Sequence, residues 1–226
     1  MIYKFKPYTI VLALLSIAFL MFLQSCTDDD TGDTPEWQTV FFDDFNRSDG
    51  PVGSNYSAQI ENGSGAFSIS DNMLQLSGGI YYTIRYVNEF TNDVIRVSIK
   101  CSTTSSTSDT YGFAVCAKGT GIQESYCGAV WMVKDTVTIL KMTELGYPPL
   151  ISKAYDVQEN RSYLLEFTVN KEDLTFILKD LITGISNTWN AKDTGSLLTG
   201  GSVSINGIQG NGDVIYFDDF KIEKYE

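Results

Sequence analysis

The chain contains no histidine among its 226 residues, and this absence excludes several kinds of catalytic and metal site. Histidine is the usual general base near neutral pH, the central member of Ser-His-Asp triads and the commonest zinc ligand. Basic residues are also scarce: 16 lysines and arginines face 28 aspartates and glutamates, a formal net charge of −12. So anionic a chain would repel a polyanion. We therefore expect neither a histidine-based hydrolase nor a nucleic-acid-binding protein.

Proline is rare, with 5 residues, while 43% of the chain is apolar. This length and composition support a sizeable hydrophobic core and exclude a disordered protein. From Trp37 onward, helical periodicity is nearly absent. Short runs of β-branched and aromatic residues alternate with polar residues between Gly, Asn, Asp and Ser clusters. The pattern predicts an all-β fold, a two-sheet antiparallel β-sandwich. Residues 160–169 and 174–179 are expected to pair as a hairpin.

The first 25 residues have the pattern of a secretory signal. Lys4 and Lys6 precede an apolar run over residues 8–23, and a serine then stands before Cys26. This run is short against the ~20 residues that span a bilayer, which disfavours the alternative of an uncleaved transmembrane helix. The order Leu-Gln-Ser-Cys resembles a bacterial lipobox. That resemblance implies cleavage before Cys26 and acylation of Cys26, and so an outer-membrane lipoprotein of a Gram-negative bacterium, attached to the membrane through its lipid.

Residues 26–36 form an acidic, polar segment without apolar periodicity, which is typical of a solvated tether. The acidic run behind Cys26 resembles a surface-export signal of lipoproteins in some Gram-negative commensals. Both a protein exposed on the cell surface and a simple spacer remain open. The folded domain is expected to cover residues 37–226.

Three further cysteines follow, at positions 101, 116 and 127. Cys116 and Cys127 lie equally far from the centre of an expected hairpin turn, so a cross-strand disulfide is geometrically feasible. The alternative, which burial statistics for cysteine favour slightly, is that both are small core residues. The pairing of Cys101 stays open.

Two segments at opposite ends of the domain carry a family resemblance. The opening segment VFFDDFNRSDGPVGSNYSA and the closing segment GDVIYFDDFKIEKY resemble the first and last strands of the concanavalin A-like lectin/glucanase superfamily. The strands between them are similar to those of laminin-G-like and glycan-binding modules. The resemblance covers residues 37–226 and implies a jelly-roll sandwich.

Many glucanases of this superfamily hold a structural calcium ion between their terminal strands. Carried over onto this sequence, the resemblance implies ligands at Asp44, Asn72 and Asp218. Calcium prefers hard oxygen ligands of this kind. The alternative is that the acidic residues are solvated charges at strand ends or caps for loop amides.

The catalytic signature of the laminarinase branch, ExDxxE, is absent from the chain. A retaining glycosidase needs two carboxylates close together. Glu166 is the one glutamate expected in the middle of a strand, and no partner is marked in the sequence. The sequence therefore leaves enzymatic activity open and favours a protein that binds without cleaving.

Sugar-binding modules use aromatic faces with polar side chains around them. Alternation in IYYTIRY places Tyr81, Thr83 and Arg85 on one face, with Tyr82, Ile84 and Tyr86 on the other, so that one set is core and the other exposed. Trp131 has apolar neighbours and is expected in the core. The predicted carbohydrate-binding residues are Tyr81, Arg85, Tyr147 and Trp189.

Taken together, the sequence predicts a non-catalytic lipoprotein that captures polysaccharide. The acidic composition favours a neutral glycan over a sulfated or uronic-acid polymer. Two alternatives remain: a divergent glycoside hydrolase with unmarked paired carboxylates, and a structural or protein-interaction module with a protein partner in the cell envelope.

Overall fold

The structure is a computed structural model that describes residues 35–62, 66–78, 81–91, 94–103, 112–121, 124–158, 160–208 and 214–226. The predicted signal peptide, Cys26 and nearly all of the tether lie outside these residues. Residues Glu36–Glu226 form one compact unit. No helix in the described part is long and apolar enough to cross a membrane.

The regular secondary structure of the described residues is all strand, apart from one short 3-10 turn at Met132–Lys134. The strands are β1 (Trp37–Asp43), β2 (Tyr56–Asn62), β3 (Ala66–Ser70), β4 (Met73–Ser77), β5 (Tyr81–Thr91), β6 (Ile95–Thr103), β7 (Gly112–Gly121), β8 (Glu124–Trp131), β9 (Thr136–Met142), β10 (Pro149–Ala154), β11 (Ser162–Asn170), β12 (Asp173–Asp180), β13 (Ser186–Lys192), β14 (Gly200–Ile208) and β15 (Val214–Tyr225).

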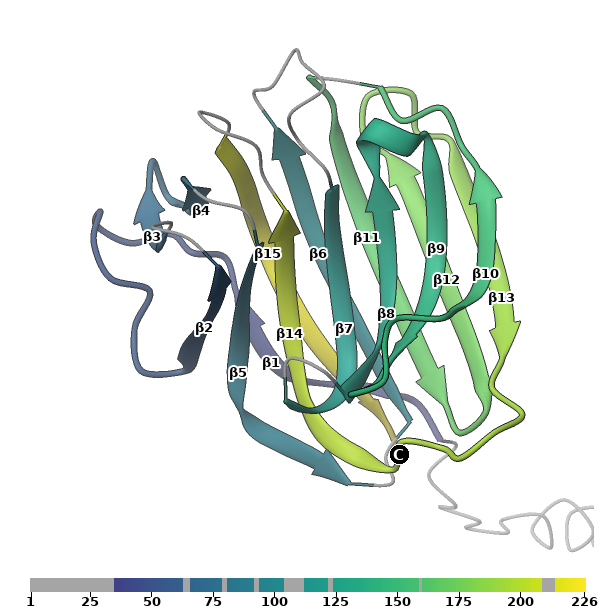
Figure 1. The fold of residues 1–226 in the computed structure, drawn as a ribbon. Helices are drawn as coiled ribbons and strands as arrows, with labels where there is room; N and C mark the ends of the chain where they lie inside the picture. The colour runs from purple at the N-terminus through teal and green to yellow at the C-terminus, as the bar shows by residue number, and fades with distance from the viewer. Residues whose placement is uncertain are drawn as a thin grey trace, which may run out of the picture. The chain divides into compact units, whose positions relative to one another are not determined.

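The strands form two antiparallel sheets packed face to face (Figure 1). One sheet has eight strands in the order β13-β12-β11-β6-β15-β4-β3, with β1 also paired to β15. The other has seven strands in the order β10-β9-β8-β7-β14-β5-β2. This arrangement confirms the predicted β-sandwich.

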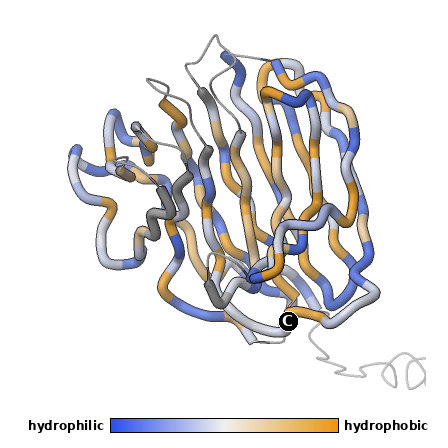
Figure 2. The backbone as a smooth tube through the Cα atoms, in the orientation of Figure 1, coloured by the Kyte–Doolittle hydropathy of each residue, from blue (hydrophilic) through white to orange (hydrophobic). Residues whose placement is uncertain are grey.

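The β11–β12 hairpin shows how the sequence builds the sandwich. Along β11, Tyr163, Leu165, Phe167 and Val169 are buried, while the residues between them are partly exposed. Each fully buried side chain of this size stabilises the fold by about 1.5–3 kcal/mol. The colours alternate in the same way along the strands in Figure 2. The two strands pair in register from Tyr163 to Asn170, which confirms the predicted hairpin.

The turn after β12 is held by a buried carboxylate. Asp180 Oδ1 accepts hydrogen bonds from the backbone N–H groups of Ile182 (2.8 Å) and Thr183 (3.1 Å), and its Oδ2 pairs with Arg161. Burial by itself would raise the pKa of Asp180, but these hydrogen bonds outweigh it and lower the pKa to about 2.

Strand β15 organises the eight-stranded sheet. One of its edges pairs with β6, and the other is shared between β4, opposite residues 214–217, and β1, opposite residues 220–225. A register shift interrupts the β6 ladder between Asp218 and Lys221, and Asp219 has a left-handed backbone with φ of 49°. The shift is a bulge, and it lies where β4 ends its share of the edge and β1 begins.

Cys116 and Cys127 are direct partners in the β7–β8 ladder, and their sulfurs form a disulfide. The slightly favoured interpretation, two unbonded core cysteines, is therefore corrected. Both residues are buried, as expected, but they point out of the sheet on the side away from the main core. Cys101 is a buried free thiol whose pKa is raised by burial.

Candidate functional site

The seven-stranded sheet has an outer face, defined here as the side chains that point away from the sandwich core. The alternate residues Ile84, Val115, Ile139 and Ile205 lie in the core, so their neighbours along each strand point outward. The ladder registers align these neighbours in rows across the sheet. One row contains Thr83, Asn206, Ala114, Ala129, Thr138 and Ser152, and the next contains Ser57, Arg85, Ser204, Cys116, Cys127 and Leu140.

One half of the outer face is polar. On β5 and β14, Thr83 lies opposite Asn206 and Arg85 lies opposite Ser204, and we call these four residues the polar patch. Thr83 and Asn206 are only 2% and 4% exposed. Three buried atoms of the patch, Thr83 Oγ1, Arg85 Nε and Asn206 Oδ1, have no hydrogen-bond partner in the described part of the chain. Buried polar groups are nearly always paired, so three unpaired atoms on adjacent strands mark this patch as unusual.

The other half of the outer face is apolar. The disulfide, Ala129, Leu140 and Met142 form a second buried cluster, separate from the main core, and Ala114 and Trp131 pack against it. We call this cluster with Ala114 and Trp131 the apolar floor. A small cavity of about 20 Å³ lies in the apolar floor, and Asn206 of the polar patch also lines it. The two halves therefore meet at Asn206.

Trp131 corrects a sequence interpretation. Its indole is partly exposed on the outer face, where Nε1 donates to Thr138 Oγ1 at 2.8 Å and the Lys134 ammonium lies 5.6 Å from the ring centroid. The sequence placed Trp131 in the core because Cys127 and Ala129 share its face. Strand β8 is buried on both sides between its ends, so apolar neighbours there do not identify the core side.

The structure brings together only part of the predicted carbohydrate-binding set. Arg85 lies in the polar patch. Tyr81 is the first residue of β5, in line with Thr83 and Arg85, and its side chain is outside the described part. Tyr147 is 48% exposed and lies between β9 and β10. Trp189 belongs to the eight-stranded sheet and packs against the core, with its ring 6.2 Å from Phe176.

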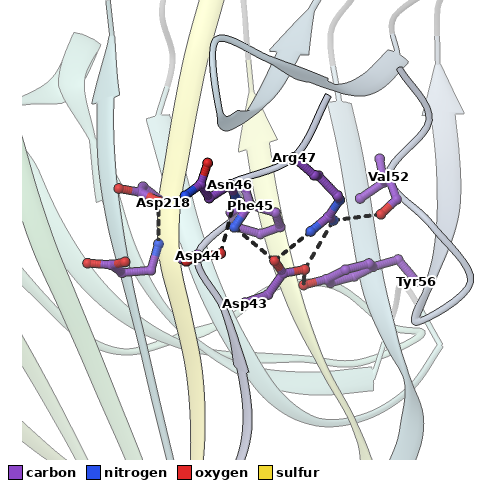
Figure 3. A network of polar contacts seen from close by, with 9 residues as sticks. Asp43, Asp44, Phe45, Asn46, Arg47, Val52, Tyr56 and Asp218 are labelled. Atoms are coloured by element: carbon purple, nitrogen blue, oxygen red, sulfur yellow. Dashed lines mark hydrogen bonds and ion pairs between the residues drawn. The ribbon is translucent and has the colours of Figure 1, made fainter. Parts of the chain in front are cut away.

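The end of β1 carries a closed polar network (Figure 3). Asp43 accepts hydrogen bonds from the Phe45 N–H (2.8 Å), from both Arg47 Nη atoms (2.7 and 3.1 Å) and from the Tyr56 hydroxyl (2.9 Å). Arg47 also donates to the Val52 carbonyl at 2.7 Å. Burial by itself would raise the pKa of Asp43, but these bonds hold it below its ordinary value. Both carboxylate oxygens are therefore engaged in holding the loop after β1.

The three predicted calcium ligands gather around the bulge of β15. Asp218 lies at the bulge, Asp44 directly follows β1, and Asn72 lies in the turn before β4. Because β1 and β4 share one edge of β15, the loop that follows β1 and the turn that precedes β4 both lie beside the bulge. Topology alone thus brings together residues that are far apart in the sequence.

The charges at this bulge are incompletely balanced. The pKa of Asp218 is raised, chiefly by burial and then by the neighbouring charges of Asp219 and Asp44. Lys100 forms an ion pair with Asp219. Within the described ranges, no group of three or more acidic, histidine or cysteine side chains is arranged to hold a metal ion. Any cation here would thus depend on two carboxylates supplemented by amide or backbone oxygens.

Glu166 lies away from the outer face. It is on β11, where its neighbours Leu165 and Phe167 are core, so Glu166 faces the exterior of the eight-stranded sheet. Its direct ladder partners are Ser98 and Ile177. Neither partner supplies the second carboxylate that a glycosidase pair needs.

No family model matches the chain, and no curated protein matches its sequence. Solved structures with low sequence identity do match its fold. The carbohydrate-binding module CBM66 from Bacillus subtilis has a TM-score of 0.60 at 13% identity, covering 76% of this chain and 98% of the module. The CBM2 module of the evolved Dit of Lactobacillus casei BL23 phage J-1 has a TM-score of 0.63 at 10% identity, covering 84% and 97%.

Legume lectins match to the same degree. Lectin II from Ulex europaeus has a TM-score of 0.61 at 14% identity, covering 81% of this chain and 97% of the lectin. At such identities the likeness establishes the fold alone. The chain has a two-sheet jelly-roll β-sandwich fold like that of these carbohydrate-binding modules and lectins.

Proposed function

We propose that this protein binds a glycan on the outer face of its seven-stranded sheet and does not cleave it. The observation that carries the proposal is the junction of the polar patch and the apolar floor at Asn206. A sugar ring has apolar faces and a hydroxyl-bearing rim, so it complements a surface with an aromatic side chain on one side and unpaired polar groups on the other. The fold shared with carbohydrate-binding modules and lectins supports the same assignment.

Each side chain has a distinct role in this proposal. The exposed part of the Trp131 ring offers a stacking surface, held in place by its hydrogen bond to Thr138. Asn206 Oδ1 and Thr83 Oγ1 are buried without a hydrogen-bond partner in the described part of the chain, so a sugar hydroxyl that bonds to them must displace the atoms that cover them. Tyr81 is the first residue of β5, the strand that also carries Thr83 and Arg85.

A calcium ion between β1, β4 and β15 belongs to the same proposal. Burial, and then the nearby charges of Asp219 and Asp44, raise the pKa of Asp218, and a divalent cation beside these carboxylates would stabilise their charged forms. Asp44, Asn72 and Asp218 supply oxygen ligands of the type that calcium prefers. A bound ion would fix the bulge and thereby the strand edge that β1 and β4 share. Its expected signature is a rise in melting temperature with calcium that EGTA reverses.

We also propose that a lipid on Cys26 anchors the protein in the outer membrane of a Gram-negative bacterium, exposed on the cell surface. The lipobox-like sequence and the acidic segment behind it support this location. Replacement of Cys26 by serine is expected to abolish labelling with a radioactive fatty acid and to release the protein from membranes. Labelling that persists in this variant would rule out Cys26 as the lipidated residue.

The function is tested by binding of the purified protein to an array of plant, fungal and host glycans, with reducing-sugar release measured on every hit. Trp131→Ala is expected to weaken binding by about tenfold, the factor that corresponds to ~1.4 kcal/mol. Tyr147→Ala and Trp189→Ala serve as comparison variants because neither residue belongs to the polar patch or the apolar floor. Loss of binding in these two, with Trp131→Ala unaffected, would move the site to the residues predicted from sequence. Release of reducing sugar would instead identify a hydrolase.

A further inference from the structure

Arg85 differs from the other three arginines in lacking a carboxylate partner among the residues that the structure describes. Arg47 pairs with Asp43, Arg96 with Glu223 and Arg161 with Asp180. Throughout the described ranges, Arg85 has no carboxylate within ion-pair distance and its buried Nε has no hydrogen-bond acceptor. The three other arginines are thus each neutralised by a carboxylate of the same chain. Arg85 is not, which sets it apart from arginines with only a structural role.

The surroundings of Arg85 make this lack of a partner costly. Its ladder neighbours on the outer face are Ser57 and Ser204, which carry no charge. Burial lowers the pKa of the guanidinium, and the charge of Glu89 acts in the opposite direction from beyond ion-pair distance. A partly buried cation without an anion is unfavourable unless something else pairs with it.

The position of Arg85 suggests what that partner is. It stands beside Thr83 and Asn206, whose unpaired oxygens suit sugar hydroxyls. A guanidinium presents a rigid fork of N–H groups that matches a carboxylate in a bidentate pair. A ligand that places a carboxylate at Arg85 and hydroxyls at its neighbours would use the whole polar patch.

We propose, resting on the glycan binding inferred above, that the ligand is an acidic glycan whose uronate carboxylate pairs with Arg85. The net charge of −12 argues against a densely charged polymer, because long-range repulsion would oppose its approach. The two constraints together define a largely neutral glycan with isolated uronate residues. This class differs from the purely neutral glycan expected from composition. Composition gives the net charge of the whole chain, whereas the charge at the polar patch is the positive charge of Arg85.

The test compares oligosaccharides that carry a single glucuronate or galacturonate with the same oligosaccharides after reduction of the carboxyl to a primary alcohol. Calorimetric titration of the purified protein is expected to show about tenfold weaker binding of the reduced form. Arg85→Gln is expected to bind both forms equally. Arg85→Lys is expected to keep part of the preference, since it keeps the charge but loses the fork.

Lys179→Gln is the matched control, because it removes one positive charge from an exposed position on β12 of the other sheet. It is expected to keep the full preference. A wild-type protein that binds both forms equally would overturn the uronate assignment and leave glycan binding intact. A preference that survives in Arg85→Gln would overturn the pairing of the carboxylate with Arg85. Failure of both forms to bind, together with silence of the neutral glycans on the array, would overturn the proposed function itself. Unchanged melting temperatures in the Arg85 variants would confirm that folding is preserved.

Discussion

The disulfide between Cys116 and Cys127 should contribute measurably to the stability of the sandwich. It closes a loop with a sequence separation of 11 residues. The loss of conformational freedom in the unfolded chain for a loop of this size corresponds to about 3 kcal/mol. For a domain near 190 residues, each kcal/mol shifts the melting temperature by about 2–4 °C. The variant Cys116→Ala/Cys127→Ala is therefore expected to melt about 6–12 °C below the wild type.

Urea unfolding followed by tryptophan fluorescence measures this loss directly. Reduction of the wild type with dithiothreitol should lower its stability by a similar amount, and the same reagent should leave the double variant unchanged. The slope of unfolding free energy against urea is expected to rise in the variant, because an unfolded chain without the cross-link exposes more surface. A loss below about 1 kcal/mol, or a wild type indifferent to dithiothreitol, would refute a stabilising role for the loop closure.

Three further predictions concern single side chains. Asp180→Asn should destabilise the protein near neutral pH and lose its effect in acid. A carboxyl with a folded pKa of about 2 contributes its full stabilisation above its unfolded pKa near 4, and this contribution is lost as the pH falls through 2. Urea unfolding measured across this pH range would show the change. Gly128→Ala should cost about 1–3 kcal/mol in the same melts, because the added Cβ would lie 2.3 Å from a ring carbon of Phe176. Tyr56→Phe should cost about 1.5–3 kcal/mol, because it removes a hydrogen bond to the Asp43 carboxylate.

Distinct outcomes would contradict these predictions. A pH-independent difference for the Asp180 variant would mean that its carboxylate charge is not what holds the turn. A neutral effect at Gly128 would show that the Phe176 ring can move aside without cost. If Tyr56→Phe matched the wild type, water would be an equally good donor to Asp43, and the network at the end of β1 would be solvated.

Local patterns in the sequence were sufficient to predict the sandwich. In β5, alternation correctly placed Thr83 and Arg85 on the face opposite Ile84 and Tyr86, because a strand with one core side and one polar side reveals its faces. The expected exposure of that polar set was wrong for Thr83, which is only 2% exposed. The same reasoning failed at Trp131, because the central part of β8 is buried on both sides. Apolar neighbours then carry no information about which side is the core.

The polar patch could not be predicted from sequence, although each of its members is visible there. It depends on the pairing of Thr83 with Asn206 and of Arg85 with Ser204, on strands that are far apart in the chain. A sequence pattern reports neighbours along one strand and not the register between distant strands. It also cannot show that Arg85 has no ion pair among the described residues, since the chain offers many acids and only the fold keeps them beyond ion-pair distance.

The central position of β15 determines the order in which the protein can fold. This strand is the last of the described strands in the sequence, yet β1, β4 and β6 all pair with it. For a chain that is exported N-terminus first, as proposed above, the eight-stranded sheet therefore stays divided until residues 214–225 have crossed the membrane, and several strand edges remain open until then. Contacts this distant in sequence slow folding and leave time for edge-to-edge association. A chaperone that holds the chain extended would thus be of most use just before β15 arrives.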